Sequence, residues 1–458
     1  MFYGRQRELD ILNDCFKSDK FESILVTGRR RIGKTSLIIK ALDSFKGLKI
    51  YYECNDSGLD SNLKSLSNIV NTVFSFPSQA TFDSLESLLD FVFQRSLKEE
   101  VILSIDEYPY LRQSYPGLDS ILQVLIDKYH EESKLRLIIS GSYVKTMKEM
   151  LLYSNPLYGR FTKEIILSDL DYLEASHFYP NYSLDEKVKA YAVFGGNPYY
   201  LSLIDPNIDV KENIIKNVLQ NRIILDSPLH IFSDEIKNIG GASSVFSAIS
   251  SGKHKFSDLT SDIITSANLP NVLDPLLEME LITKEAPINM QNNRKKTFYY
   301  IKDNYLDFFY KYIYSRKSIL LAMGADNFFN TYISDDLNNT FVPLKFEKLV
   351  KEAIILLNKK NKLVPLAIAV GKYWYDDPKS RTNGEFDVVY EDINHDYHFV
   401  EAKYLNSKVG QKIVDEEIEQ VGKLRLKKFY LGFASKSGFD LKNKADYLLL
   451  DLNDLYSI

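Results

Sequence analysis

The sequence is poor in the residues that build disulfide-rich folds and thiolate metal sites. Its 458 residues include only two cysteines, Cys15 and Cys54, six histidines and one tryptophan. Two cysteines cannot form a disulfide framework, and they exclude a zinc site built mainly on thiolates. The chain also has no HExxH metalloprotease segment. We therefore expect a protein of the reducing cytoplasm.

Long apolar runs and an excess of one charge are also missing. The first ten residues, MFYGRQRELD, lack the apolar core of a signal peptide, and no later stretch is apolar for long enough to cross a bilayer. Lys and Arg number 57 against 62 Asp and Glu, a net charge of -5. This balance gives no overall attraction to nucleic acid or anionic lipid. We expect a soluble protein without a membrane partner.

The length predicts about three domains, at roughly 150 residues for each. In the first 168 residues, four short runs rich in Val, Ile and Leu are separated by longer amphipathic segments: SILVTG, GLKIYYEC, VILSIDE and LRLIISG. This alternation is typical of parallel strands buried on both faces by helices. Residues 1–168 are therefore predicted to form an α/β core.

The rest of the chain predicts four further parts: a helical lid over 169–233, a winged helix over 234–304, a helical connector over 305–339 and a second α/β domain over 340–458. Three short helical segments followed by ITKEAPI, a polar turn and TFYYI indicate the winged helix.

The third helix of this winged helix carries acidic residues and no Arg or Lys, so it would be repelled by phosphates. Three wing residues favour DNA instead: Arg294, Lys295 and Lys296. We interpret the region as a packing module between domains rather than a reader of sequence.

The strongest motif is GRRRIGKT at residues 28–35, which matches G-x-x-x-x-G-K-[ST] between a predicted strand and a predicted helix. The glycines let the loop curl so that backbone N–H groups face a polyphosphate, aided by the positive end of the helix. Lys34 would contact the β and γ phosphates, and the Thr35 hydroxyl would bind Mg²⁺. We predict an ATP·Mg²⁺ site that includes Gly28, Arg29, Arg30, Arg31, Ile32, Gly33, Lys34, Thr35 and Ser36.

Two carboxylates end the apolar strand VILSIDE. Asp106 and Glu107 would face a ligand at the carboxyl edge of the sheet, where sites of α/β proteins lie. Asp106 is expected to hold the metal, and Glu107 to orient and partly deprotonate the attacking water. Ser140, at the end of the next strand, could contact the γ phosphate or the water. Arg160 could sense transition-state charge, although a surface salt bridge fits it equally well.

Several segments in order resemble the archaeal-type ATPases of the STAND group, relatives of AAA+ proteins: FYGRQREL, GRRRIGKT, ILSIDE, IISGS and GGNP. The resemblance covers about the first 230 residues. It implies that Phe2, Gly4 and Arg5 lie near the adenine, and that Gly196 and Pro198 of the lid contact the nucleotide. Pro198 fits a simple helix start equally well. The resemblance also implies a slow switch, in which the nucleotide sets the arrangement of appended domains.

A second group of carboxylates lies near the carboxyl terminus. Asp387 and Glu401-x-Lys403 fall on two predicted neighbouring strands, and Glu347 lies on the preceding helix. Two carboxylates can bind a divalent metal while a lysine steadies the water, although alternating charges on strands can also mean only a solvated face. The region from about Phe346 resembles the uncharacterised, PD-(D/E)xK nuclease-like domain that commonly follows these ATPases. Nearly balanced charges beyond residue 340 predict modest affinity for DNA.

Together these patterns predict an α/β fold: a P-loop NTPase core of the AAA+/STAND type, a helical lid, a winged helix and a restriction-endonuclease-like domain. The expected function is binding and hydrolysis of ATP with Mg²⁺, coupled to a nuclease-like domain that acts on DNA. Two alternatives stay open. One is a nucleotide-gated scaffold for a protein partner without nuclease activity, and the other is a DNA-binding regulator that acts through the winged helix.

Overall fold

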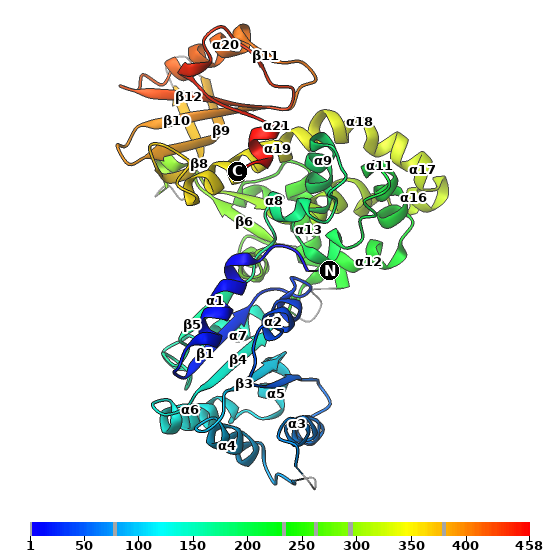
Figure 1. The fold of residues 1–458 in the computed structure, drawn as a ribbon. Coiled ribbons are helices and arrows are strands. Elements are labelled where there is room, and N and C mark those ends of the chain that lie inside the picture. The colour runs from blue at the N-terminus through cyan, green and yellow to red at the C-terminus, as the bar shows by residue number, and fades with distance from the viewer. Residues whose placement is uncertain (1, 77–79, 231–234, 261–263, 292–295, 378–381) are drawn as a thin grey trace. The chain divides into compact units, whose positions relative to one another are not determined.

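The computed structural model describes all residues except 1, 77–79, 231–234, 261–263, 292–295 and 378–381. The chain forms two compact units, Met1–Asp169 and Leu170–Ile458, and each has its own sheet and its own cores (Figure 1).

The first unit alternates strands with helices, as the spacing of its apolar runs predicts. Its strands are β1 (Glu22–Thr27), β2 (Leu48–Glu53), β3 (Val101–Asp106), β4 (Leu135–Gly141) and β5 (Lys163–Ile166). Its helices are α1 (Gln6–Lys17), α2 (Lys34–Leu42), α3 (Leu59–Val73), α4 (Leu85–Arg95), α5 (Tyr108–Ser114), α6 (Leu118–Tyr129) and α7 (Val144–Glu149).

All neighbouring strands of this sheet run parallel in the order β2-β3-β4-β1-β5. The prediction of four strands was one short, because β5 has the sequence KEII and only Ile165 of it is buried. Side chains of the central strands alternate between two cores. Ile24 and Val26 of β1 pack in the core that includes α1 and α2, whereas Leu25 packs with α3, α4 and α6. Burial on both faces explains why these strands are almost wholly apolar.

The second unit begins with helices. Residues Leu170–His230 contain α8 (Tyr172–Ser176), α9 (Leu184–Phe194), α10 (Pro198–Leu201), α11 (Val210–Asn213) and α12 (Arg222–His230). Next come α13 (Ile239–Ser250), α14 (Leu269–Glu278) and the antiparallel strands β6 (Ile282–Glu285) and β7 (Phe298–Ile301). A helical segment follows, with α15 (Asn304–Phe308), α16 (Lys317–Met323), α17 (Ala325–Phe328), α18 (Ser334–Asp336) and α19 (Val342–Lys359), linked in part by π-helical turns.

Described residues of the segment between β6 and β7 pack onto the carboxy-terminal sheet. Ile288 is part of the core of that sheet, and the Asn289 side chain bonds both the N–H and the carbonyl of Trp374 at 3.1 and 2.7 Å. The Lys296 ammonium lies 4.2 Å from the centre of the Trp374 ring. Arg294 and Lys295 fall outside the described residues. The described part of this segment, which was predicted to be a wing, is therefore engaged in packing within the unit.

The carboxy-terminal sheet is mixed, with the order β14-β12-β10-β9-β8. Its strands are β8 (Ala367–Asp377), β9 (Thr382–Asp392), β10 (Tyr397–Lys403), β12 (Phe429–Ser435) and β14 (Leu448–Asp451). The first three pair antiparallel, and the last three pair parallel. The short strands β11 (Val409–Gly410) and β13 (Phe439–Asp440) form a separate pair, and the helices α20 (Gln411–Gly422) and α21 (Leu452–Tyr456) complete the unit.

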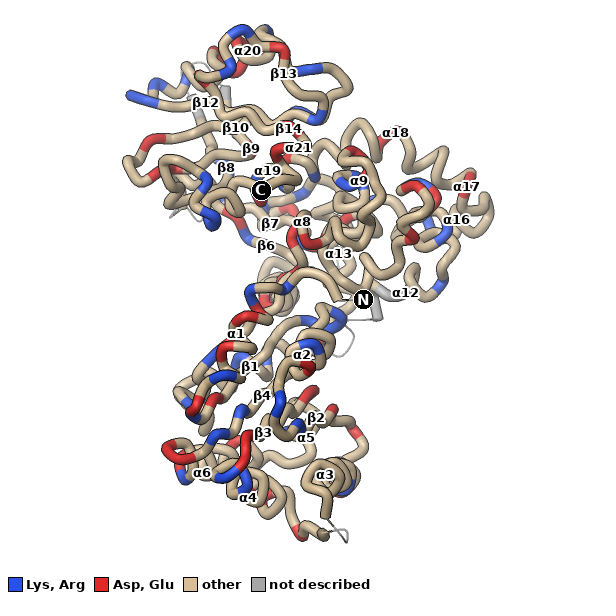
Figure 2. Tube along the Cα trace, viewed as in Figure 1, with Lys and Arg blue, Asp and Glu red and all other residues tan. Residues whose placement is uncertain are grey.

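Acidic and basic residues are interspersed along both units (Figure 2). Among the described residues, no helix combines the length and the apolar character needed to cross a membrane.

Candidate nucleotide site

The glycine-rich loop joins β1 to α2 at the carboxyl edge of the parallel sheet. Gly28 has a φ of 153°, and a Cβ there would lie 2.7 Å from the Leu167 carbonyl oxygen. Gly33 has a φ of 94° and precedes the first residue of α2. Both positions therefore require glycine, one for a close approach and one for a left-handed turn. The loop leads directly into the amino end of the nine-residue helix α2. The backbone N–H groups at such a helix end can bind an anion.

Lys34 is buried within this loop, with only 4% of its surface exposed. Its ammonium donates to the carbonyl oxygens of Gly28 and Arg29, at 2.9 and 3.2 Å, and to the Ser142 hydroxyl at 2.7 Å. The predicted phosphate-binding lysine is thus folded back onto its own loop and onto the end of β4.

Asp106 is fully buried at the end of β3 and receives three side-chain hydrogen bonds. Thr35 Oγ1 and Tyr51 OH donate to Oδ2 at 2.6 and 3.0 Å, and Ser140 Oγ donates to Oδ1 at 2.6 Å. Burial, followed by the nearby Asp106 carboxylate, raises the pKa of Tyr51. The two residues predicted to bind Mg²⁺ are therefore in direct contact, and Ser140 orients the carboxylate.

Glu107 follows in a left-handed conformation, with a φ of 49°, just before α5 begins. This backbone conformation is unfavourable for a non-glycine residue, and such strain concentrates at functional sites. The Ser142 N–H donates to Glu107 Oε2 at 3.1 Å, and the Ser142 hydroxyl donates to Oε1 at 2.5 Å. Ser142 therefore joins the lysine of the loop to the candidate catalytic carboxylate.

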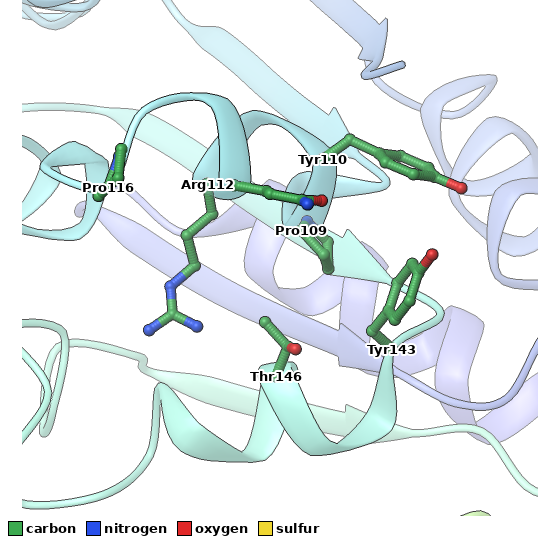
Figure 3. Close-up of a pocket in the computed structure, with 7 residues that line it drawn as sticks. Pro109, Tyr110, Arg112, Pro116, Tyr143 and Thr146 are labelled. Carbon is green, nitrogen blue, oxygen red and sulfur yellow. The ribbon is translucent and has the colours of Figure 1, made fainter. Parts of the chain in front are cut away.

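Two arginines of the loop contact different parts of the first unit. Arg29 forms an ion pair with Asp169, and Arg30 donates to the hydroxyls of Tyr110 and Tyr143 at 3.1 and 3.2 Å. These two tyrosines line a pocket of about 390 Å³. Its other lining residues come mainly from α5, the helix that begins directly after Glu107. Figure 3 shows the Arg112 side chain of this pocket directed away from the tyrosine pair. Arg31 adopts a left-handed φ of 64° within the loop.

Residues 2–204 match a family described as an ATPase domain predominantly from Archaea, and residues 309–414 match a family of archaeal and bacterial proteins of unknown function. An uncharacterized protein of Methanocaldococcus jannaschii is 31% identical over 99% of this chain and 100% of its own length. The chain belongs to the same family as this Methanocaldococcus protein, and its residues 2–204 are an archaeal-type P-loop ATPase domain.

One solved structure has a similar fold over about two thirds of this chain. The Walker-type ATPase of Pyrococcus abyssi is 18% identical, with a TM-score of 0.53, over 68% of this chain and 96% of that protein. The ORC2 protein of Aeropyrum pernix, in ADPNP and ADP complexes, is 13% identical, with a TM-score of 0.45, over 69% and 96%. The match of residues 2–204 to the ATPase family, and the fold shared with the Walker-type ATPase, show that the amino-terminal unit is a P-loop ATPase domain.

One predicted member of the ATP site lies elsewhere. Arg160 precedes β5, which runs parallel to β1, so it lies at the edge of the sheet opposite the loop. Its guanidinium forms two hydrogen bonds with the exposed Asp127 carboxylate, at 2.8 and 2.9 Å. Arg160 thus lies in an ion pair with Asp127, at the edge of the sheet opposite the loop, and this placement does not favour the predicted role in sensing phosphate charge.

The amino-terminal residues implied by the resemblance lie close to the loop. The Arg5 guanidinium donates to the carbonyls of Ile32 and Ser168, and Phe2 packs against the core that contains α1 and α2. Gly4 has a left-handed φ of 69° beside the equally left-handed Arg5. This segment forms a fixed support beneath the loop.

Gly196 and Pro198 belong to the second unit, and their contact with nucleotide stays a prediction. A Cβ at Gly196 would lie 1.9 Å from the Leu170 carbonyl oxygen, so this position accepts no larger residue. Pro198 starts α10, and the Asn197 side chain caps that helix through the Tyr199 N–H at 3.0 Å. Both residues thus have evident structural roles.

The carboxy-terminal carboxylates are held mainly by lysines. Lys372 donates to Asp387 at 2.6 Å and to Glu385 at 3.1 Å, and Lys403 pairs with Glu401. Strand β9 has one extra residue opposite β8 at this point, because Gly371 pairs with Val389 while Tyr373 pairs with Phe386. Such a β-bulge redirects a side chain, and Asp387 lies within it.

Glu347 of α19 lies near this group. Burial, and then the Asp387 carboxylate, raise the pKa of Glu347 to about 8, while the Lys372 ammonium opposes the change. No set of three or more His, Cys, Asp or Glu side chains in the described part of the chain is arranged to hold a metal ion. The predicted group of Glu347, Asp387 and Glu401 is therefore brought close but is not assembled as a metal site in this structure.

Three contributors were missed by the sequence reasoning. Ser142 lies in the segment IISGS, but the sequence reasoning predicted a contact with the γ phosphate or the water for Ser140 only. Tyr51 gave no signal beyond its place near the end of β2. Glu417 of α20 is 7% exposed, and burial, followed by the Glu401 carboxylate, raises its pKa to about 7. Its helical sequence, VDEEIEQ, offered no reason to choose this glutamate over its neighbours.

Proposed function

We propose that this protein hydrolyses ATP with Mg²⁺ and uses the nucleotide state as a switch. The observation that carries the proposal is the chain of contacts from Lys34 through Ser142 to Glu107, beside the contact between Thr35 and Asp106. Phosphoryl transfer needs a phosphate cradle, a metal and an oriented water, and these five residues supply the groups for each.

The residues present fit Mg²⁺. The Thr35 hydroxyl and the Asp106 carboxylate are oxygen donors 2.6 Å apart, at the amino end of α2. Hard oxygen donors of this kind suit Mg²⁺, which keeps several waters and binds the phosphates as well. Bound there, the ion would neutralise charge on the β and γ phosphates.

Phosphate binding would rearrange the existing contacts. The Lys34 ammonium would leave the carbonyls of the loop and Ser142 for the β and γ phosphates, because a hydrogen bond between two charged groups is stronger than one to a neutral oxygen. Ser142 would then keep only its bonds to Glu107, which holds this carboxylate ready to accept a proton from water. The switch is thus an exchange of partners by one lysine.

For the second unit we propose a nuclease-like function with DNA as its target. Support comes from the mixed sheet, the bulge at Asp387 and the proximity of Glu347 and Glu401 to that residue. The alternative, a nucleotide-gated scaffold for a protein partner, is supported by the ion pairs that engage these carboxylates. Packing of the wing against Trp374 argues against a regulator that reads DNA with its winged helix.

Turnover and binding of ATP test the first proposal. Lys34→Ala should lose most of its affinity for ATP, whereas Glu107→Gln should bind ATP·Mg²⁺ normally by calorimetry and release phosphate at least about a hundredfold more slowly. Unchanged turnover in Glu107→Gln would show that Glu107 does not orient the attacking water.

Plasmid DNA incubated with ATP and Mn²⁺ tests the second proposal. Nicking that is lost in Glu401→Ala supports a nuclease, and absence of nicking in the parent protein supports the scaffold.

A further inference from the structure

The second unit contains a cavity of about 670 Å³ that the sequence did not reveal. It is lined by residues from the end of α13, from β6 and β7, from α19 and from β8 and β9. Its volume lies within the range of small-molecule sites. Because all of these residues belong to Leu170–Ile458, the cavity is separate from the P-loop in Met1–Asp169.

Lysines from several elements line this cavity. Lys345, Lys348 and Lys351 recur every three residues along α19, so they lie along one face of the helix. Lys372 of β8 and Lys311 add two further ammonium groups. Five carboxylates line the same cavity, where Lys345 pairs with Asp307 and Lys372 pairs with Asp387. Lys351 pairs with Glu285 at 2.9 Å, and both side chains keep about a quarter of their surface exposed, at 25% and 29%. An ammonium carries three donors, so a single carboxylate partner leaves it able to bind a second anion.

The cavity also presents aromatic rings. His254 and Tyr300 both line it, with ring centres 4.6 Å apart and an angle of 32° between the rings. The Lys372 ammonium lies 5.2 Å from the centre of the Tyr300 ring. Aromatic faces next to cationic groups bind nucleotides, because bases stack on the rings while phosphates bind the cations. Asp387, in the bulge of β9, lines the same cavity.

The size of the cavity limits what can enter it. A volume of about 670 Å³ suits a ligand of the size of one nucleotide, as small-molecule sites of this volume do.

We propose that this cavity binds a nucleotide, either free or at the end of a single strand. The base lies against His254 and Tyr300, and the phosphate lies beside Lys348 and Lys351 of α19. This site is additional to the ATP site and does not depend on ATP hydrolysis. Asp387 belongs both to this site and to the proposed nuclease-like site. If the second unit is a nuclease, as proposed above, its substrate is the end of a single strand.

Calorimetry on the full-length Lys34→Ala protein tests the proposal, because that change weakens the P-loop site. The probes are thymidine 5′-monophosphate, a 5′-phosphorylated thymidine trinucleotide, a DNA hairpin duplex and inorganic phosphate. We expect one binding site, with the hairpin and inorganic phosphate each at least about tenfold weaker than the better of the first two probes. Preference for the monophosphate identifies a free nucleotide as the ligand, and preference for the trinucleotide identifies a strand end.

Two variants locate the binding. Ser251→Trp, at an exposed residue that lines the cavity, blocks it without removing a charge. Lys351→Met removes one ammonium, and each variant should weaken binding about tenfold or more. The matched control is Lys359→Met, an exposed lysine at the end of the same helix and outside the cavity lining. Absence of binding, affinity unaffected by both cavity variants, or equal weakening in the control would overturn the proposal. None of these results alters the ATP turnover measured in the protein with Lys34 intact.

Discussion

Both units place a lysine beside carboxylate-bearing strands, but they hold it differently. Lys34 bonds two main-chain carbonyls and a hydroxyl, whereas Lys372 bonds the carboxylates of Asp387 and Glu385. A phosphate can replace neutral oxygens at a lower free-energy cost than it can replace carboxylates. The first lysine is therefore arranged to exchange partners, while the second is part of the structure that keeps its carboxylates in place.

The largest effect on activity is expected from a change of Asp106, the buried carboxylate at the end of β3. Asp106→Asn keeps the shape of the side chain but removes the charge that holds the metal, so ATP turnover should fall about a thousandfold. Phosphate release at saturating ATP measures it. Asp127→Asn is the control, because it breaks only the exposed bridge to Arg160. Normal turnover in Asp106→Asn, or an equal loss in the control, would contradict the assignment.

The comparison between the two lysines can be tested by removing both charges with the same substitution. Lys372→Met leaves Asp387 and Glu385 without their cation, and the second unit should lose about 3 kcal/mol of stability. Urea unfolding followed by fluorescence reports on this unit, because Trp374, the only tryptophan, lies on β8. Lys34→Met should leave this transition unchanged while it abolishes ATP binding. Equal transitions in both variants would mean that Lys372 contributes no more to the fold than Lys34 does.

The residues that the motif brings together in the candidate nucleotide site could be predicted from the sequence, and their roles with ATP stay predictions. The spacing of Gly28, Gly33 and Lys34 is local and rigid, and parallel strands bring Asp106 and the end of β4 to one edge. The choice between Ser140 and Ser142 could not be predicted. Both end the same strand, and only the geometry shows that Ser140 bonds Asp106 while Ser142 bonds Glu107.

The second unit was less predictable, because its features depend on long-range packing. The bulge at Asp387 depends on the pairing of β9 with β8, and no residue pattern marks it. The cavity is formed by segments between Ile249 and Asp387 that meet only in the folded chain. The edge of the sheet at which Arg160 lies depends in the same way on the direction of β5, a strand that was not predicted from the sequence.

A smaller effect is expected from the titration of Glu347. Its pKa of about 8 in the fold is higher than its ordinary value of 4.5, so folding favours the neutral form. The stability that this group contributes is fully present below about pH 4.5 and is lost as the pH rises through about 8. Glu347→Gln should therefore remove roughly 2 kcal/mol of the decline in stability between pH 5 and pH 9. Unfolding followed by Trp374 fluorescence at both pH values measures it, and parallel declines in variant and parent would contradict it.

The smallest effect concerns the residue that joins Lys34 to Glu107. Ser142→Ala removes the hydroxyl that accepts from Lys34 and donates to Glu107, but it keeps the N–H bond to Glu107. The carboxylate is then less well oriented, so kcat should fall about tenfold. At the same time Lys34 has one partner fewer to leave, so KM for ATP should fall rather than rise. Steady-state kinetics separate the two constants. A rise in KM at unchanged kcat would mean that Ser142 supports nucleotide binding alone, and that the exchange of partners by Lys34 does not reach the catalytic carboxylate.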